Sequence, residues 1–130
     1  MRWTEADFDS MSWHDNHVHG LEIREGEDGT GELILRLDHI LEWLSPGEGG
    51  RFSFRIAPAT LTFRGVFALR IELDYIGYAF TPFSIAGISR EGNRWSIGIN
   101  WPEGIISFDA TSFVQELTGE EVLSDKQSLH

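Results

Sequence analysis

Residues 17–38 decide the fold, and their sequence is HVHGLEIREGEDGTGELILRLD. From His17 to Ile23 the odd positions are apolar or histidine, and valine, glycine and glutamate alternate with them. This alternation is typical of a strand with one face in the core. Glycines and acids fill residues 25–30, as in a hairpin turn, and leucines then occupy the odd positions of residues 33–37. The stretch therefore predicts two strands joined as a hairpin.

The segment that follows, residues 38–44, is compatible with two structures. Its leucines and isoleucine fit helical spacing, but continued alternation also places His39, Leu41 and Trp43 on the face of the preceding leucines. We prefer the strand, which the loop at residues 45–50 would end.

Six further strand-like runs follow along the chain. Pro58 separates the first two, and turns rich in glycine, asparagine or proline separate the last three. The runs are residues 51–56, 59–64, 69–75, 85–90, 94–101 and 104–109. About eight strands joined mostly by short loops predict an all-β fold, either an antiparallel β-sandwich or an open barrel.

One or two short helices are expected near the ends of the chain. Thr4 followed by Asp7 has the spacing of a helix cap, so residues 6–11 can form a helical turn. Residues 112–118 carry apolar side chains at helical spacing, and Gly119 follows as a stop signal.

Length and composition bound the fold and the function. The 130 residues fit a single β-rich domain over residues 1–119, followed by a polar C-terminal tail over residues 120–130. The 10 basic and 21 acidic residues give a net charge of −11, which would repel a nucleic acid backbone. Without cysteine there is no disulfide, no thiolate metal site and no cysteine nucleophile. No signal peptide or membrane span is visible, so we expect a cytoplasmic protein without a membrane partner.

Three histidines form the first candidate site. His17 and His19 lie on one face of the first strand, and pairing across the hairpin would bring either of them opposite His39. Three histidines from neighbouring strands can hold a catalytic zinc with one position open for water. The alternative is a set of neutral, hydrogen-bonded core or rim residues, and we therefore expect no cofactor. A secondary pair, His14 and Asp15, could orient an imidazole as a base, but no nucleophile is identifiable.

Aromatic residues form the second candidate site. Tyr75, Tyr78, Phe80 and Phe83 fall in a segment where the strand pattern lapses. Such residues can form a ligand pocket or a partner-binding patch, or else a lid folded onto the sheet. Trp95 and Trp101, by contrast, share a face with isoleucines and are expected in the core.

Two segments also carry a resemblance. The opening WHDNHVHG of residues 13–20, with APATLTF at residues 57–63, resembles a group of small uncharacterised bacterial proteins. The opening Trp-His-Asp followed by a strand is also similar to some immunity proteins of bacterial polymorphic toxin systems. The resemblance implies a small cytosolic β-rich bacterial protein, and for the immunity group one that neutralises a toxin by binding it.

The sequence therefore favours a binding or immunity-type protein over an enzyme, with a basic toxin-like domain as its partner. The enzyme alternative is a metal-dependent hydrolase or lyase built on the three histidines. We also expect that a homodimer could form by pairing of a sheet edge at residues 103–109 or of the tail.

Overall fold

The computed structural model describes residues 1–46 and 50–129 and confirms an all-β protein. Within these ranges, nine strands form one antiparallel sheet, and a six-residue 3-10 helix follows the first strand. The elements are β1 (Arg2–Thr4), η1 (Glu5–Ser10), β2 (His17–Glu25), β3 (Gly31–Leu44), β4 (Ser53–Leu73), β5 (Phe83–Glu91), β6 (Arg94–Trp101), β7 (Glu103–Asp109), β8 (Ser112–Leu117) and β9 (Val122–Ser124). The ambiguous segment 38–44 is extended, as we preferred, and three residues of the loop expected to end it (47–49) lie outside the described ranges. In the described part of the chain, no helix has the length and hydropathy needed to span a membrane.

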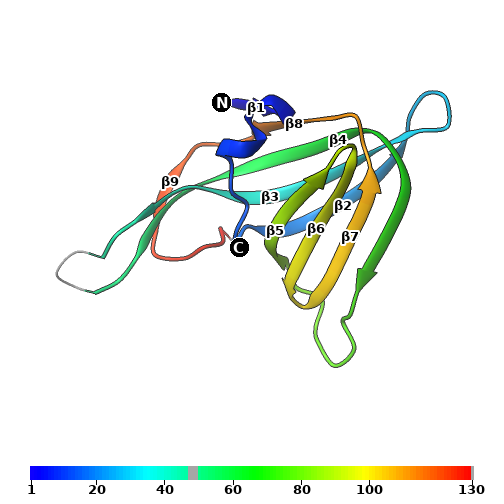
Figure 1. Ribbon diagram of the computed structural model, residues 1–130. Helices are drawn as coiled ribbons and strands as arrows, with labels where there is room; N and C mark the ends of the chain where they lie inside the picture. The colour runs from blue at the N-terminus through cyan, green and yellow to red at the C-terminus, as the bar shows by residue number, and fades with distance from the viewer. Residues whose placement is uncertain (47–49, 130) are drawn as a thin grey trace.

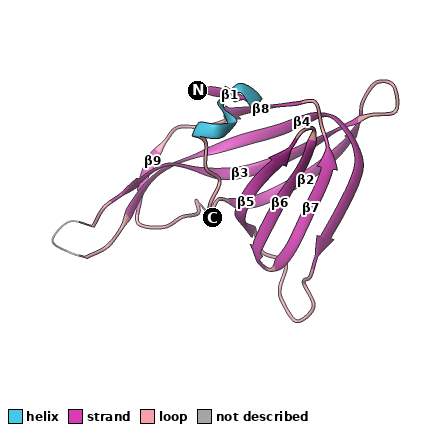
Figure 2. Cartoon of the chain, in the orientation of Figure 1, coloured by secondary structure: helices cyan, strands magenta, loops and turns pink. Residues whose placement is uncertain are grey.

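The sheet curls into a barrel-like shape. Its path β4-β3-β2-β5-β6-β7 returns to β4, because β7 pairs with the second half of that strand. Figure 1 shows β5, β6 and β7 crossing the direction of β2 and β3. One side is closed only weakly, since β2 and β5 share just the pairs His17↔Ser84 and Val18↔Phe83. The remaining strands extend the sheet along the first half of β4, where β8 and β9 pair with it and β1 pairs with β8 (Figure 2).

The 21 residues of β4 join three of the predicted strands, except for residues 51–52 and 74–75 at its two ends. The sequence predicts a break at Pro58, but Pro58 lies inside β4, opposite Asp38 of β3. Its carbonyl oxygen accepts from Thr118 N at 2.8 Å, so its missing N–H would point to the same side, away from β3. On that side β8 pairs from Ala59 onward and β9 pairs only as far as Ile56. The proline therefore lies where pairing passes from β9 to β8, and its missing N–H removes no donor from the ladder with β3.

The N-terminal helix is confirmed and the C-terminal helix is wrong. In η1 the Thr4 side chain accepts from Ala6 N, and the Asp7 carboxylate accepts from Thr4 N at 2.9 Å. Residues 112–118, however, contain the strand β8. The segment is short enough for its apolar residues to fit either period, and pairing with β4 and β1 on its two sides outweighs the helical spacing.

The tail expected at residues 120–130 packs against the domain as far as it is described. Its residues 122–124 form β9 on the edge of β4, and Gln127, Ser128 and Leu129 make hydrogen bonds to the domain. His130 lies outside the described residues.

Aromatic and aliphatic side chains fill the interior of the barrel. The largest fully buried ones are Leu33, Leu35, Leu37, Leu61, Phe63, Ile85, Trp95, Ile97, Ile106, Phe108 and Phe113, whereas Ile56 is buried in a separate small cluster with Ile40 and Phe54. They come from both crossing halves of the sheet, so the barrel is a packed core, and any binding site must lie on its outside or at its ends.

Candidate functional site

The structure does not bring the three histidines together. In β2 and β3, the predicted pairs Ile23↔Leu33 and Leu21↔Leu35 are formed, but His17 pairs with Asp38 and not with His39. A β-bulge between Val18 and Gly20 inserts His19 as an extra residue. Because one inserted residue exchanges the two faces of a strand, Val18 points into the core and His17 shares the outer face with Asp38.

Asp38 is the centre of a small polar cluster on this outer face. Its Oδ1 lies 3.3 Å from Nε2 of His19, and its Oδ2 accepts from the Ser128 hydroxyl at 3.2 Å and from Leu129 N at 3.0 Å. The carboxylate is fully buried because the C-terminal segment covers it. Sequence analysis missed Asp38, although an acid in the middle of an apolar strand is an unusual residue that could have drawn attention to it.

His39 lies on the opposite face and is held there as a neutral imidazole. Asn16 Nδ2 donates to His39 Nδ1 at 2.8 Å, so the ring carries its proton on Nε2, and Trp3 packs edge-on at 5.3 Å between ring centroids. Burial lowers the pKa of His39 from 6.5 to about 4. Among the described residues, no group of three histidine, aspartate or glutamate side chains is placed to hold a metal ion. The zinc arrangement that the sequence allowed is therefore not formed.

The buried His39 predicts a loss of stability in acid. The unfolded chain binds a proton near pH 6.5 and the folded protein only near 4, so stability is complete above about pH 6.5 and falls as the pH approaches 4. At about 1.4 kcal/mol per pH unit, this difference amounts to about 3 kcal/mol. Urea denaturation of the wild type and of His39→Gln between pH 7 and 4 isolates the contribution of His39 to the free energy of unfolding. The two proteins have the same carboxylates, so acid titration of those groups affects both equally. Equal acid sensitivity of the two proteins would contradict the prediction.

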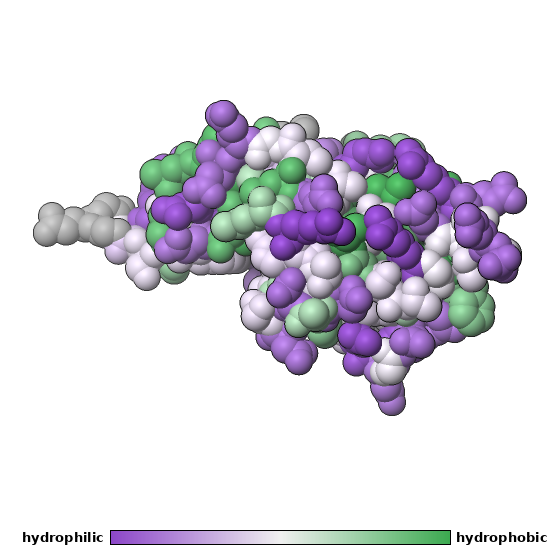
Figure 3. All heavy atoms as spheres, turned by 90° about the horizontal axis from the view of Figure 1, so that it is seen from above, coloured by the Kyte–Doolittle hydropathy of each residue, from purple (hydrophilic) through white to green (hydrophobic). Residues whose placement is uncertain are grey.

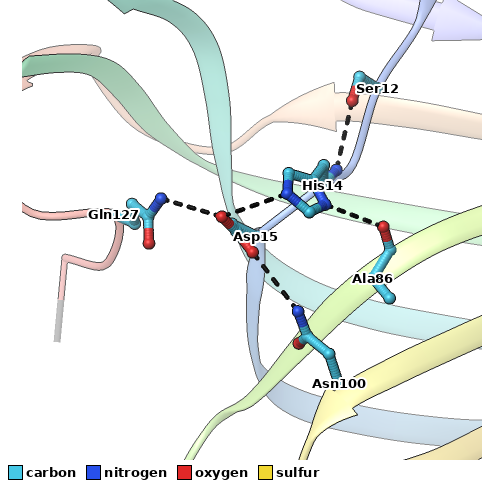
Figure 4. Close-up of polar contacts among 6 residues, drawn as sticks. All are labelled: Ser12, His14, Asp15, Ala86, Asn100 and Gln127. Atoms are coloured by element: carbon cyan, nitrogen blue, oxygen red, sulfur yellow. Dashed lines mark hydrogen bonds and ion pairs between the residues drawn. The ribbon is translucent and has the colours of Figure 1, made fainter. Parts of the chain in front are cut away.

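His14 and Asp15 form a structural junction (Figure 4). His14 Nδ1 donates to the Ala86 carbonyl oxygen at 3.1 Å, and its Nε2 lies 3.5 Å from Asp15 Oδ2. Asp15 also accepts from Asn100 of β6 and from Gln127 of the C-terminal segment. The junction thus connects the turn before β2 with β5, β6 and the tail. The neighbouring Ser12 hydroxyl, drawn in Figure 4, accepts a hydrogen bond from the backbone N of His14 at 3.3 Å.

The aromatic segment forms an exposed loop over residues 74–82, at the bottom of the barrel in Figure 1. Phe83, the last of the four predicted patch residues, is buried in the core at the start of β5. Tyr75 and Phe80 pack together at 5.1 Å between ring centroids, and the Tyr75 hydroxyl donates to Thr81 O at 2.9 Å. The loop is therefore ordered by its own contacts while Phe80 is 92% exposed.

Two residues that sequence analysis did not assign to this patch belong to it. Ile76 at the tip of the loop is 88% exposed. Trp101 was expected in the core beside Trp95, but it is more than half exposed and packs edge-on against Tyr78 at 4.8 Å between ring centroids. Trp101 is the last residue of β6. The alternation that buries Trp95 continues to Trp101, but the core ends before it. We call Ile76, Tyr78, Phe80 and Trp101 the aromatic patch.

Acids lie beside the aromatic patch on the side of Ile76. Asp74 begins the loop, and Glu72 and Glu103 line a surface hollow beside Ile76. By contrast, the face of the molecule seen from above mixes apolar and hydrophilic residues without one dominant apolar area (Figure 3). The patch is thus an apolar area with three acids on one side of it.

No family model, no curated protein and no solved structure matches this chain.

Proposed function

We propose that the protein is a binding protein that recognises a basic protein partner through the aromatic patch. The observation that carries the proposal is the exposure of Ile76 and Phe80, at 88% and 92%, on a loop held in shape by internal contacts. Large apolar side chains on an ordered loop supply contact area without a large loss of conformational entropy on binding.

Electrostatics favours a basic partner. The chain carries a net charge of −11. Of the acids beside the patch, Glu72 pairs with Arg70, whereas Asp74 and Glu103 have no basic side chain within ion-pair distance among the described residues. Their charge is available to a positive surface, and the field of the whole chain would accelerate its approach. A basic toxin-like domain has this character, and its neutralisation by tight binding is our specific proposal within this class.

The proposal is tested by partner capture with matched variants. Immobilised wild-type protein is expected to retain a basic protein at low salt and to release it at high salt. Replacing Ile76 and Phe80 together with serine should weaken that binding by about 30-fold or more, as is usual for apolar anchor residues at an interface. The matched control is Leu123→Ser, which removes a 70% exposed apolar side chain from β9, away from the loop.

Two outcomes would contradict the proposal. One is that no basic protein is retained at low salt. The other is that the Ile76→Ser and Phe80→Ser double variant captures the partner as well as Leu123→Ser does, since binding would then use another surface.

A further inference from the structure

Among the residues that the structure describes, one edge of the sheet has no partner strand. β2 pairs with β5 only at His17 and Val18, and from Gly20 to Glu25 it pairs with β3 alone. The described residues place no other strand on this side. Two of its side chains, Leu21 and Ile23, are 36% and 59% exposed although their partners on β3 are fully buried. Exposed strand edges with apolar side chains readily accept another strand.

The backbone of this edge presents donors and acceptors at fixed positions. At the hairpin tip, which projects from the barrel in Figure 1, Gly26 N donates to Thr30 O at 2.9 Å. Because hydrogen-bonded and non-hydrogen-bonded pairs alternate in an antiparallel ladder, Arg24 and Glu22 bond to β3. The N–H and C=O groups of Leu21, Ile23 and Glu25 therefore point outward, to the open side.

We infer that this edge pairs with the same edge of a second copy of the chain, antiparallel about a two-fold axis at Ile23. The inference rests on strand pairing and sequence and does not depend on the proposed function. In this register Ile23 faces Ile23 of the second copy, and Glu22 of each chain faces Arg24 of the other. Leu21 and Glu25 complete the added ladder of hydrogen bonds.

Neighbouring registers are disfavoured by charge. Two copies can form hydrogen bonds only when residues with outward-pointing N–H and C=O groups lie opposite one another. The two neighbouring registers that meet this condition have the two-fold axis at Glu22 or at Arg24. With the axis at Glu22 this residue faces its own copy, and with the axis at Arg24 two guanidinium groups face each other. Like charges directly opposite destabilise a strand pair. Hydrogen bonds from Arg36 and Arg24 hold the pKa of Glu22 below its usual value, so the carboxylate is charged at neutral pH.

The aromatic loop limits the length of the added strand. Val18, His19, Gly20 and Leu21 share the walls of a cavity of about 290 Å³ with Tyr75 and Phe80. The loop therefore faces Gly20 across this hollow and blocks the approach of another strand there, so pairing extends only over Leu21–Glu25. A contact of this length is small and two chains of charge −11 repel each other, so the dimer is weak and strengthens with salt. Partner binding through the acids beside the patch would respond to salt in the opposite direction.

Analytical ultracentrifugation over a range of concentrations tests the inference. The wild type should show a concentration-dependent dimer, and Ile23→Pro should remove it, because proline deletes an outward N–H without touching the ladder to β3. Arg24→Glu alone and Glu22→Arg alone should each weaken self-association by about tenfold, since both create like-charge pairs across the axis. An equimolar mixture of these two variants should associate again, because each glutamate then faces an arginine.

The matched control is Ile76→Ser, which should dimerise like the wild type. A single-chain mass for the wild type at every concentration and salt, a dimer that survives Ile23→Pro, or a mixture no better than its components would overturn the inference. Circular dichroism of each variant verifies that it is folded.

Discussion

Replacing Phe63 with alanine is expected to lower the free energy of unfolding by about 4 kcal/mol. Phe63 is fully buried, and its ring lies 5.3 Å from Trp95, 4.7 Å from Phe108 and 5.7 Å from Phe113, measured between centroids. These three rings belong to β6, β7 and β8, so the truncation leaves a cavity where both crossing halves of the sheet meet. Urea denaturation at neutral pH, followed by tryptophan fluorescence, measures the change.

The control for this prediction is Phe80→Ala. It removes the same atoms from a side chain that is almost fully exposed, and the free energy of unfolding should change by less than about 0.5 kcal/mol. Similar losses for the two variants would mean that Phe63 does not occupy the centre of the core.

Asn16→Ala is expected to cost about 3 kcal/mol, although it removes no apolar contact. The buried Asn16 side chain donates to His39 Nδ1 at 2.8 Å and accepts from Ile40 N at 3.2 Å. Alanine leaves both partners buried without a hydrogen bond, and each such group costs free energy. Denaturation of the variant beside the wild type at pH 7 gives the value, and a loss below about 1 kcal/mol would contradict it.

Asn16→Asp separates the hydrogen bonds from the charge of His39. The carboxylate keeps an acceptor for Ile40 N but places a negative charge against His39 Nδ1, which favours the protonated ring and raises its pKa. The stability lost between pH 6.5 and 4 should therefore shrink in this variant, because the folded and unfolded pKa values of His39 move closer. An unchanged acid sensitivity would show that His39 is not the titrating group.

The alternation of apolar and polar residues predicted the strands well where one face of the strand is buried and the other is exposed to solvent. Leu33, Leu35 and Leu37 predicted the hairpin and two of its cross-strand pairs. Any register that turned this face of the strand toward solvent would expose all three leucines. The sequence does not show that three runs join into β4. Pro58 signals a break unless its missing N–H faces the place where one neighbouring strand ends and the next begins, as it does here.

The candidate sites show the same limit. The alternation of His17 and His19 with their neighbours gives no sign of the bulge, and a single inserted residue was enough to exchange the faces and separate both histidines from His39. Gly20 was the available hint, because glycine inside a strand often marks a bulge. Composition alone predicted the aromatic loop. The exposure of Ile76 and Trp101, which also belong to the patch, depends on where the strands end, and only the three-dimensional arrangement decides this.

The length of β4 has a consequence for how the chain folds. β4 pairs with β3, β7, β8 and β9, which come from both sides of it in the sequence. The hydrogen bonds along both edges of β4 can form only when the segments before it and after it in the sequence are both in place. A folding intermediate in which only one of these segments has paired therefore gains little stability. We therefore expect a single cooperative unfolding transition and slow folding, because most of the pairings of β4 join segments that are far apart in the sequence.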